Sequence, residues 1–394
     1  MKVVQICPYP FPSLGGPARS YQHFNRILHS EVIGLVRARH AAVEKPVVPL
    51  NVTVRVIDPL HLGYYYYAPS ARMRDAEQTI ATADCVLVHG FFLYPEIWAM
   101  RTCRRHGVPY VIIPHGIFDP WSMRKNTFIK QLWIRLYGRE VLRHAARILY
   151  ATERERSKAA WLPVQAPGSV IKWAVELVDS TTARSHRDVV RRELGLVATD
   201  RVLIFFGRLH SMKRPLETVR LLASFAFEHL KLMVVGPDGD VTQAQLQAEA
   251  DAAGWTGLRL VGPVWDDKKY DYICAADGYI SLSHRENFNY TLGETMAAGL
   301  APIISPGNDL GLEFAAEGFA WQLKGDSPEE LRGVIQEFLT LSDGALRARG
   351  EAASRWAHAH LNMNRFDTEV HSLVMTLAAQ QALAQSSRTR VAAA

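Results

Sequence analysis

The chain has 394 residues, of which 48% are hydrophobic and 21% charged, as in globular proteins large enough for two or three hydrophobic cores. Its four cysteines lie far apart and form no Cys-x-x-Cys pair, which argues against a disulfide framework or a zinc site and fits a reducing compartment. No run approaches the roughly 18 apolar residues of a membrane-spanning helix, and the opening MKVVQICPYPFP is typical of a strand, not of a signal peptide. We therefore expect a cytoplasmic protein.

The net charge of +6 is unevenly distributed. Residues 1–172 hold 23 Lys and Arg against 11 Asp and Glu, whereas the remainder holds 22 against 28. A basic first half beside an acidic second half predicts an anionic partner for the first half. Nucleic acid, an anionic membrane surface and an acidic acceptor all fit this charge.

Short apolar runs alternate with helical segments along the chain, which predicts parallel strands whose sheets are covered on both faces. In the first half, strands are predicted at Val3–Cys7, Val52–Ile57, Cys85–His89, Tyr110–Pro114, Ile148–Tyr150 and Val170–Trp173. In the second half, they are predicted at Val202–Phe206, Leu230–Val235, Leu258–Val261, Gly278–Leu282, Pro302–Ser305 and Ala320–Leu323.

The runs fall into two groups of six, which predicts an α/β chain with two Rossmann-like domains. Weak apolar periodicity and a cluster of small polar residues at 179–185 place the boundary near Ala174–Arg192. We expect a first domain at 1–174 and a second at 175–358. The last helical segment ends near Ala384, and the small, polar tail at 385–394 is expected to be disordered.

Ligands of doubly wound sheets bind after the strands, at their carboxyl ends. After the first strand, Gly15 and Gly16 would let backbone amides approach a ligand, although an ordinary strand-to-helix turn fits equally well. After the predicted fourth strand, His115 could hydrogen-bond a substrate hydroxyl, or it could be a structural histidine.

The segment from Met123 to Tyr150 carries a basic stripe. Four arginines recur at every fourth position and would share one helix face: Arg135, Arg139, Arg143 and Arg147. Phe128, Leu132 and Leu136 lie beside that face. The pattern fits a helix on a membrane surface, and it also fits a packed helix with a solvated arginine face.

The second half repeats the arrangement of polar residues after strands. Arg208 and Lys213 follow the strand at 202–206 and could clamp a diphosphate, although a solvated basic loop is the alternative. Gly236 lies directly after the strand at 230–235. Val264 lies after the strand at 258–261, where the apolar backbone could flank a planar base. The Asp238-Gly-Asp240 tripeptide is interpreted as a turn, and no metal is assigned to it.

Two glutamates eight positions apart mark the next strand exit. Glu286 lies in the loop after the strand at 278–282, and Glu294 lies inside the helix that starts near Tyr290. A strand, a loop with backbone amides and a helix N-terminus form a cradle for phosphate. A carboxylate beside such a cradle suits a sugar hydroxyl, so this segment predicts a nucleotide or nucleotide-sugar site.

The stretch from Val202 to Ser305 resembles the donor-binding domain of GT-B glycosyltransferases of family 4. The resemblance rests on Gly207-Arg208 with Lys213, the turns 235–237 and 261–264, the glutamate pair and the segment 296–302, in the family's order and spacing. It implies two facing Rossmann-like domains with a catalytic cleft between them. It also implies a C-terminal helix, 359–384, that crosses back to the first domain.

The resemblance further implies retaining transfer of a sugar from a nucleotide-sugar, without a metal or other cofactor. The implied catalytic residues are His115 at the sugar, Glu286 near the reacting carbon, and Arg208 and Lys213 at the departing diphosphate. No side-chain nucleophile is assigned, because the family's reaction is often drawn as same-face attack. The implied donor-binding residues are Gly15, Gly16, Gly207, Gly236, Val264, Asn287, Phe288, Asn289, Tyr290 and Glu294, the last on the ribose.

Two positions depart from the family pattern. Asn289 stands where a glycine is usual, and asparagine tolerates the unusual backbone angles that this position requires. Trp173-Ala-Val-Glu176 replaces the common Asn-Gly-Val-Asp at the domain junction.

We therefore expect a glycosyltransferase that uses a UDP- or GDP-sugar and acts on a glycan acceptor, lipid-linked, in bacterial surface polysaccharide synthesis. The basic half, through the four arginines, would rest on the inner membrane surface, and no nucleic acid would be bound. The divergent first half, including Tyr64–Tyr67, would select the acceptor. The alternatives are an NAD(P)-dependent oxidoreductase, for which Asp58 follows the second strand but no GxGxxG occurs, and a non-enzymatic binder of anionic lipid or nucleic acid.

Overall fold

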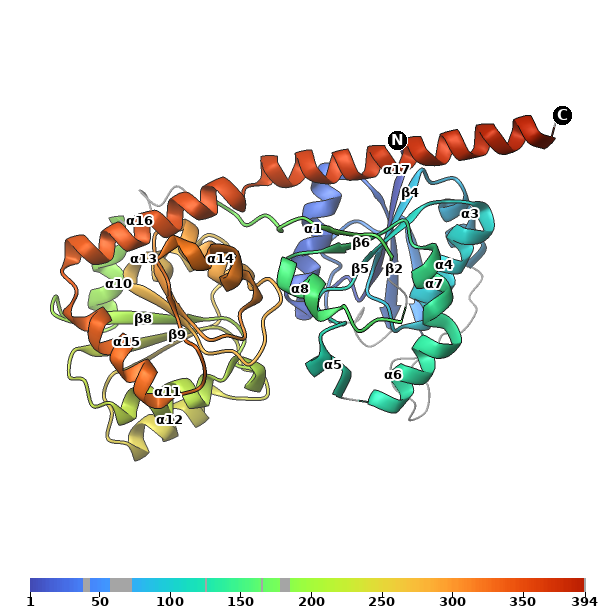
Figure 1. Ribbon diagram of the computed structural model, residues 1–394. Coiled ribbons are helices and arrows are strands. Elements are labelled where there is room, and N and C mark those ends of the chain that lie inside the picture. Colours follow the sequence, from blue (N-terminus) through green and yellow to red (C-terminus); the bar gives the residue numbers. More distant parts are fainter. Residues whose placement is uncertain (38–42, 57–72, 125, 164–165, 178–184, 393–394) are drawn as a thin grey trace. The chain divides into compact units, whose positions relative to one another are not determined.

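The computed structural model describes residues 1–37, 43–56, 73–124, 126–163, 166–177 and 185–392. It forms two compact units, one comprising Met1–Trp173 with Asn364–Ala394 and the other Ala174–Met363. Each unit holds one parallel sheet with helices on both faces (Figure 1). The predicted α/β class with two parallel sheets is confirmed. Tyr64–Tyr67, Asp58 and most of the polar cluster 179–185 lie outside the described residues.

The sheet of the first unit has the order β3-β2-β1-β4-β5-β6-β7. Its strands are β1 (Val3–Pro8), β2 (Glu31–Arg37), β3 (Val52–Val56), β4 (Cys85–His89), β5 (Tyr110–Ile113), β6 (Arg147–Tyr150) and β7 (Gly168–Val170). Its helices are η1 (Pro12–Leu14), α1 (Gly16–Leu28), α3 (Met73–Ala81), α4 (Tyr94–His106), α5 (Pro120–Arg124), α6 (Thr127–Trp133), the π-helical turn η3 (Ile134–Gly138), α7 (Arg139–His144) and α8 (Glu153–Lys158).

Two strand predictions in this sheet were wrong. Strand β2 was missed because Gly34 interrupts its apolar run; a Cβ at this glycine would lie 2.7 Å from the Leu50 side chain. His115 therefore follows the fifth strand and not the fourth. The last strand, β7, ends at Val170, where its pairing with β6 stops, so the predicted run to Trp173 has already left the sheet.

The sheet of the second unit has the order β10-β9-β8-β11-β12-β13, with the six strands that the sequence predicted. They are β8 (Arg201–Phe206), β9 (Leu230–Val235), β10 (Leu258–Gly262), β11 (Gly278–Ser281), β12 (Ala301–Ile304) and β13 (Trp321–Gln322). The helices are α10 (Arg187–Glu193), η4 (Ser211–Lys213), α11 (Pro215–Ser224), α12 (Gln243–Ala252), α13 (Lys268–Ala275), α14 (Tyr290–Ala297), η5 (Asp309–Glu317), α15 (Pro328–Thr340) and α16 (Asp343–His360).

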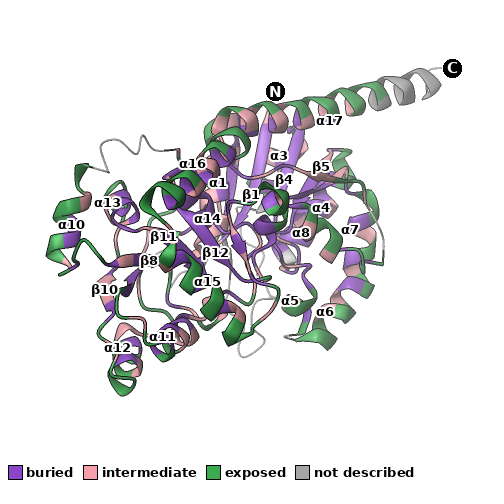
Figure 2. Ribbon diagram, turned by 60° about the vertical axis from the view of Figure 1, so that its left-hand side comes forward, coloured by how far each residue is buried: buried purple, intermediate pink, exposed green. Residues whose placement is uncertain are grey.

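The central strands are buried on both faces, which explains why their sequences are continuously apolar. Every residue of β1 and β4 is buried, whereas the outer faces of the helices are exposed (Figure 2). Each Å² of apolar surface that these strands bury stabilises the fold by about 25 cal/mol. This burial is the main stabilising contribution in a domain of this size.

The last helix, α17 (Met363–Ala392), closes the core of the first unit. The ring of Phe366 lies 5.1 Å from that of Phe24 in α1 and 6.0 Å from that of Trp173. Farther along, Gln381 Nε2 donates to the carbonyl oxygen of Gly107 at 2.8 Å. The tail expected to be disordered from residue 385 continues as helix to Ala392, because α17 contains no glycine or proline and is rich in good helix formers.

The predicted arginine stripe is only partly formed. Ala145 adopts an extended conformation and ends α7, so Arg147 lies in strand β6 and not on the helix. The π-helical turn η3 also changes the angular phase between Arg135 and Arg139. Arg135, Arg139 and Arg143 nevertheless remain exposed on one continuous helical segment.

We expect Gly350→Ala to destabilise the second unit by about 2 kcal/mol, the cost of overpacking, although alanine favours helix. Gly350 lies where α16 packs on the end of α14, and a Cβ there would lie 2.0 Å from the carbonyl oxygen of Gly299. Urea unfolding measures the change. The control is Gly333→Ala in α15, where a Cβ meets no described atom within 4 Å and stability should be unchanged or higher. Equal stability of the two variants would contradict this packing.

Candidate functional site

Several of the predicted site residues follow the strands at which the strand order reverses. In the second unit, β8 has β9 on one side and β11 on the other, and in the first unit β1 has β2 on one side and β4 on the other. Open parallel sheets bind ligands outside the carboxyl ends of their strands at such switch points. Arg208 and Lys213 follow β8, Glu286 follows β11, and Gly15 with Gly16 follows β1.

Two predicted glycines bring the exits of β8 and β9 together. Gly207 (φ 140°) and Gly236 (φ 151°) both adopt backbone angles that favour glycine. A Cβ on Gly236 would lie only 2.0 Å from the carbonyl oxygen of Gly207. A Cβ on Gly207 would in turn touch Lys213 Cε at 3.4 Å. The glycines therefore let backbone and the lysine stem share this confined corner, with Arg208 exposed beside it.

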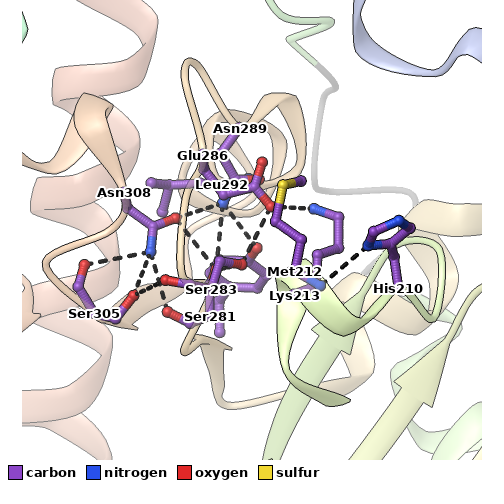
Figure 3. A network of polar contacts seen from close by, with 11 residues as sticks. His210, Met212, Lys213, Ser281, Ser283, Glu286, Asn289, Leu292, Ser305 and Asn308 are labelled. Atoms are coloured by element: carbon purple, nitrogen blue, oxygen red, sulfur yellow. Dashed lines mark hydrogen bonds and ion pairs between the residues drawn. The ribbon is translucent and has the colours of Figure 1, made fainter. Parts of the chain in front are cut away.

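Lys213 and Glu286 form a direct ion pair between the exits of β8 and β11 (Figure 3). Ser283 Oγ donates to the same carboxylate oxygen at 3.2 Å. The backbone fixes both partners, since His284 N donates to Met212 O at 2.9 Å and Glu286 N donates to Gly307 O at 2.8 Å. Both side chains are largely buried, so each charge depends on the other or on a ligand.

Asn289 performs the structural task of the glycine that is usual in the family. Its backbone lies in the left-handed region (φ 53°, ψ 74°), and its Oδ1 caps α14 by accepting from Leu292 N at 3.3 Å. Its Nδ2 donates to Asn308 Oδ1 at 2.8 Å (Figure 3). The expectation that asparagine preserves this loop is confirmed, and the side chain also ties the helix to the β12 exit.

Glu294 is held by a lysine that sequence reasoning missed. Lys269 Nζ, from α13, lies 2.8 Å from Glu294 Oε1 and 3.0 Å from Glu176 Oε2. Lys269 and Glu294 are both buried, whereas the Glu176 side chain is exposed. A single lysine in a helix gives no pattern that could have indicated this role. Glu176, noted only as a departure at the domain junction, completes the cluster.

The remaining donor-binding predictions lie around the start of α14 and the β10 exit. The rings of Phe288 and Tyr290 pack edge to face at 5.0 Å, and both are buried. Oδ1 of Asn287 is buried and has no hydrogen-bond partner among the described residues, so a ligand donor could satisfy it. Val264 is partly exposed in the loop after β10.

The first unit contributes Gly15, Gly16 and His115. Gly15 (φ 76°, ψ −127°) precedes α1, whose first residue is Gly16, so the amides of this helix N-terminus follow β1 after the short turn η1. His115 (φ 51°) is partly exposed, and its Nε2 lies 2.9 Å from Nδ1 of the fully buried His89. His89 was missed, although both β4 and β5 are followed by the same signal, His-Gly at 89–90 and at 115–116.

Desolvation keeps both imidazoles neutral. Desolvation lowers the pKa of His115 to about 3, and desolvation together with the neighbouring His115 lowers the pKa of His89 well below its usual value. A neutral histidine offers one donor and one acceptor, so His115 can accept a hydrogen bond from a hydroxyl.

We expect Lys269→Met to destabilise the second unit by about 3–5 kcal/mol, because it leaves the buried Glu294 carboxylate without its cation. Adding Glu294→Gln should restore much of the loss, as measured by urea unfolding. The matched control is Lys268→Met, which removes the exposed neighbouring lysine and should change stability by less than about 0.5 kcal/mol. No difference between the two lysine variants would contradict the buried cluster.

Comparison with known proteins identifies relatives that match both units. A family model described as glycosyl transferases group 1 matches residues 186–356, and one described as glycosyl transferase 4-like domain matches residues 16–171. A GDP-mannose:cellobiosyl-diphosphopolyprenol alpha-mannosyltransferase of Xanthomonas campestris is 26% identical over 327 residues, 77% of this chain and 78% of the relative. A D-inositol 3-phosphate glycosyltransferase of Thermobispora bispora is 34% identical over 208 residues, 50% of this chain and 48% of that protein.

Solved structures show the same fold. HepE of Anabaena, solved in complex with UDP, superposes with a TM-score of 0.77 at 14% identity, covering 95% of this chain and 100% of the other. The sucrose-phosphate synthase of Thermosynechococcus elongatus gives 0.73 at 15% identity, covering 96% and 100%. The two family models span most of the chain, which belongs to the group 1, family 4 glycosyltransferases and has the GT-B fold.

Proposed function

We propose that this glycosyltransferase transfers a sugar from UDP- or GDP-sugar, with retention and without a metal, to a lipid-linked glycan in bacterial surface polysaccharide synthesis. The observation that carries the donor site is the Lys213–Glu286 pair beside the N-terminus of α14, at the switch point of the second sheet. The family membership excludes the oxidoreductase and the non-enzymatic binder as the main function.

The charges at this switch point suit a nucleoside diphosphate. Arg208 and Lys213 supply two cations, and the first turn of α14 adds amides and the positive end of a helix dipole. Lys213 would exchange Glu286 for the diphosphate, which would leave Oε1 of Glu286 to accept from a hydroxyl of the donor sugar. Glu294, one helical turn inside α14, would bind the ribose with its orientation fixed by Lys269.

Leaving-group stabilisation without a metal rests on those same cations and amides, which act strongly where water is excluded. The one aspartate pair that resembles a metal motif has other partners. Asp238 Oδ1 accepts from Gln243 N at 3.0 Å, and Asp240 Oδ1 accepts from Ser211 N at 2.7 Å, so both carboxylates organise loops.

The lipid-linked acceptor is supported by a surface of the first unit. Phe128, Ile129, Leu132 and Leu136 on α6 and η3 are between 44% and 78% exposed, and the arginines at 135, 139 and 143 lie on the same helical segment. Exposed apolar side chains beside cations are typical of a helix that lies in an anionic membrane interface. None of the helices in the described part of the chain has both the length and the apolarity that crossing a bilayer requires. The Xanthomonas relative is named for a diphosphopolyprenol acceptor.

Nucleotide release from a panel of nucleotide-sugars with a lipid-linked acceptor tests the reaction, in the presence and absence of EDTA. We expect turnover that EDTA does not change, and a loss of about 100-fold or more in Glu286→Gln. The control is Glu249→Gln, a partly exposed ion-pairing residue on α12. No turnover and no donor-induced thermal stabilisation with any donor would overturn the function, and full activity of both Glu286→Ala and Glu294→Ala would remove the site assignment.

Co-sedimentation with phosphatidylglycerol-containing vesicles tests the membrane surface. Phe128→Ser with Leu132→Ser should lower the partition coefficient at least ~10-fold, since about 0.8 kcal/mol is lost per buried CH₂. The control is Leu312→Ser, a leucine of the second unit that is 53% exposed. Binding that is independent of anionic lipid, or equal loss in the control, would contradict the assignment.

A further inference from the structure

A chain of hydrogen bonds runs through the first unit and ends at His115. His115 Nε2 lies 2.9 Å from His89 Nδ1, and His89 Nε2 lies 2.9 Å from Gln5 Oε1. Gln5 Nε2 donates to Ser30 Oγ at 2.6 Å, and Ser30 Oγ donates to Asn25 Oδ1 at 3.2 Å. The chain links β5, β4, β1 and α1, and its three inner members are buried while Asn25 and His115 are partly exposed.

With the Asn25 and Gln5 amides oriented as in the structure, the directions of these hydrogen bonds assign each proton of the chain. Ser30 gives its only hydrogen to Asn25, so it must accept from the Gln5 amide nitrogen. The carbonyl oxygen of Gln5 then faces His89, which must carry its proton on Nε2. Because His89 is neutral, its Nδ1 is an acceptor, and His115 must donate to it from Nε2.

Aromatic packing holds the two imidazoles in place. Their planes are within 10° of each other with centroids 5.2 Å apart. The rings of Tyr21 and Phe24 both pack edge-on against His89, with centroid distances of 4.6 Å and 5.6 Å. The ring centroid of Trp173 lies 6.2 Å from that of His115. Neither ring can turn over without disturbing buried side chains.

We propose that Gln5 and His89 are positioning residues that hold the proton of His115 on Nε2, so that its Nδ1 presents a lone pair to a hydroxyl group of the bound sugar. His115 follows β5 at the carboxyl edge of the sheet. Its Nδ1 atom makes no hydrogen bond to any of the described residues. This inference rests on the proposed function for the identity of the hydroxyl. Such an acceptor selects for a sugar that has a hydroxyl at this position, and it disfavours a deoxy or fluoro analogue, which has no proton to donate.

Long-range ¹H–¹⁵N NMR correlation on the full chain with ¹⁵N-labelled histidine reads the tautomers directly, without any substrate. We expect both His89 and His115 to carry the proton on Nε2. A proton on Nδ1 of His115 would overturn the proposal whether or not the protein turns over a sugar. Absence of turnover with every donor would instead overturn the proposed function, so the two failures are distinguishable.

Gln5→Met removes the acceptor that orients His89. We expect mixed tautomers at both histidines and a loss of sugar transfer of about 10-fold, as for one lost hydrogen bond, with unchanged affinity for UDP and GDP. Should this variant fold poorly, Ser30→Ala breaks the chain one link farther away, and Ser30→Thr, which keeps the hydroxyl, should behave as the wild type. Unchanged transfer in a variant with mixed tautomers would overturn the positioning role.

A control separates this role from simple loss of a buried hydrogen bond. Tyr110, in β5, donates its hydroxyl to the carbonyl oxygen of Val141 and has no part in the histidine chain. Tyr110→Phe should lower stability comparably while leaving both tautomers and transfer unchanged. A loss of transfer in Tyr110→Phe equal to that in Gln5→Met would identify the effect as structural and overturn the proposal.

Discussion

The side chain of Asn289 is the constraint on which the proposed donor site depends. It caps α14 through Leu292 N and reaches Asn308 after β12, while Asn308 Nδ2 donates to Ser281 O at the end of β11. One side chain therefore fixes the helix that carries Glu294 relative to the loop that carries Glu286. A glycine could adopt the same left-handed backbone but could make neither contact, so this chain has a more strongly connected loop than the family pattern provides.

The buried charges of Glu286 and Glu294 are tolerated because each of these two carboxylates has its own lysine. Glu286 pairs with Lys213 across two strand exits, and Glu294 pairs with Lys269 from a different helix. The two pairs differ in what they permit. Lys213 is the last residue of the short 3₁₀ turn η4 at the carboxyl edge of the sheet, where the proposed function has it exchange partners, whereas Lys269 is buried and lies between two carboxylates.

The sequence predicted those features of the structure that depend on residues close together in the chain. Continuous apolar runs predicted the buried strands, and the glutamate spacing predicted a loop carboxylate and a helix carboxylate, because both depend on neighbours in sequence. Strand β2 was missed since a glycine interrupts its run, and Arg147 was misplaced since one extended residue ends α7. The partners Gln5–His89 and Lys269–Glu294 are 84 and 25 residues apart, so only the folded chain brings them together.

The position of α17 also has a consequence for how the protein is made. The second unit is continuous from Ala174 to Met363, whereas the first includes the last residues of the chain. On the ribosome, β1 to β7 emerge first, but Phe24 and Trp173 gain their contact with Phe366 only after the whole second unit has been synthesised. The unit that emerges first is therefore the last to be completed, and its aromatic surface requires protection from aggregation until synthesis ends.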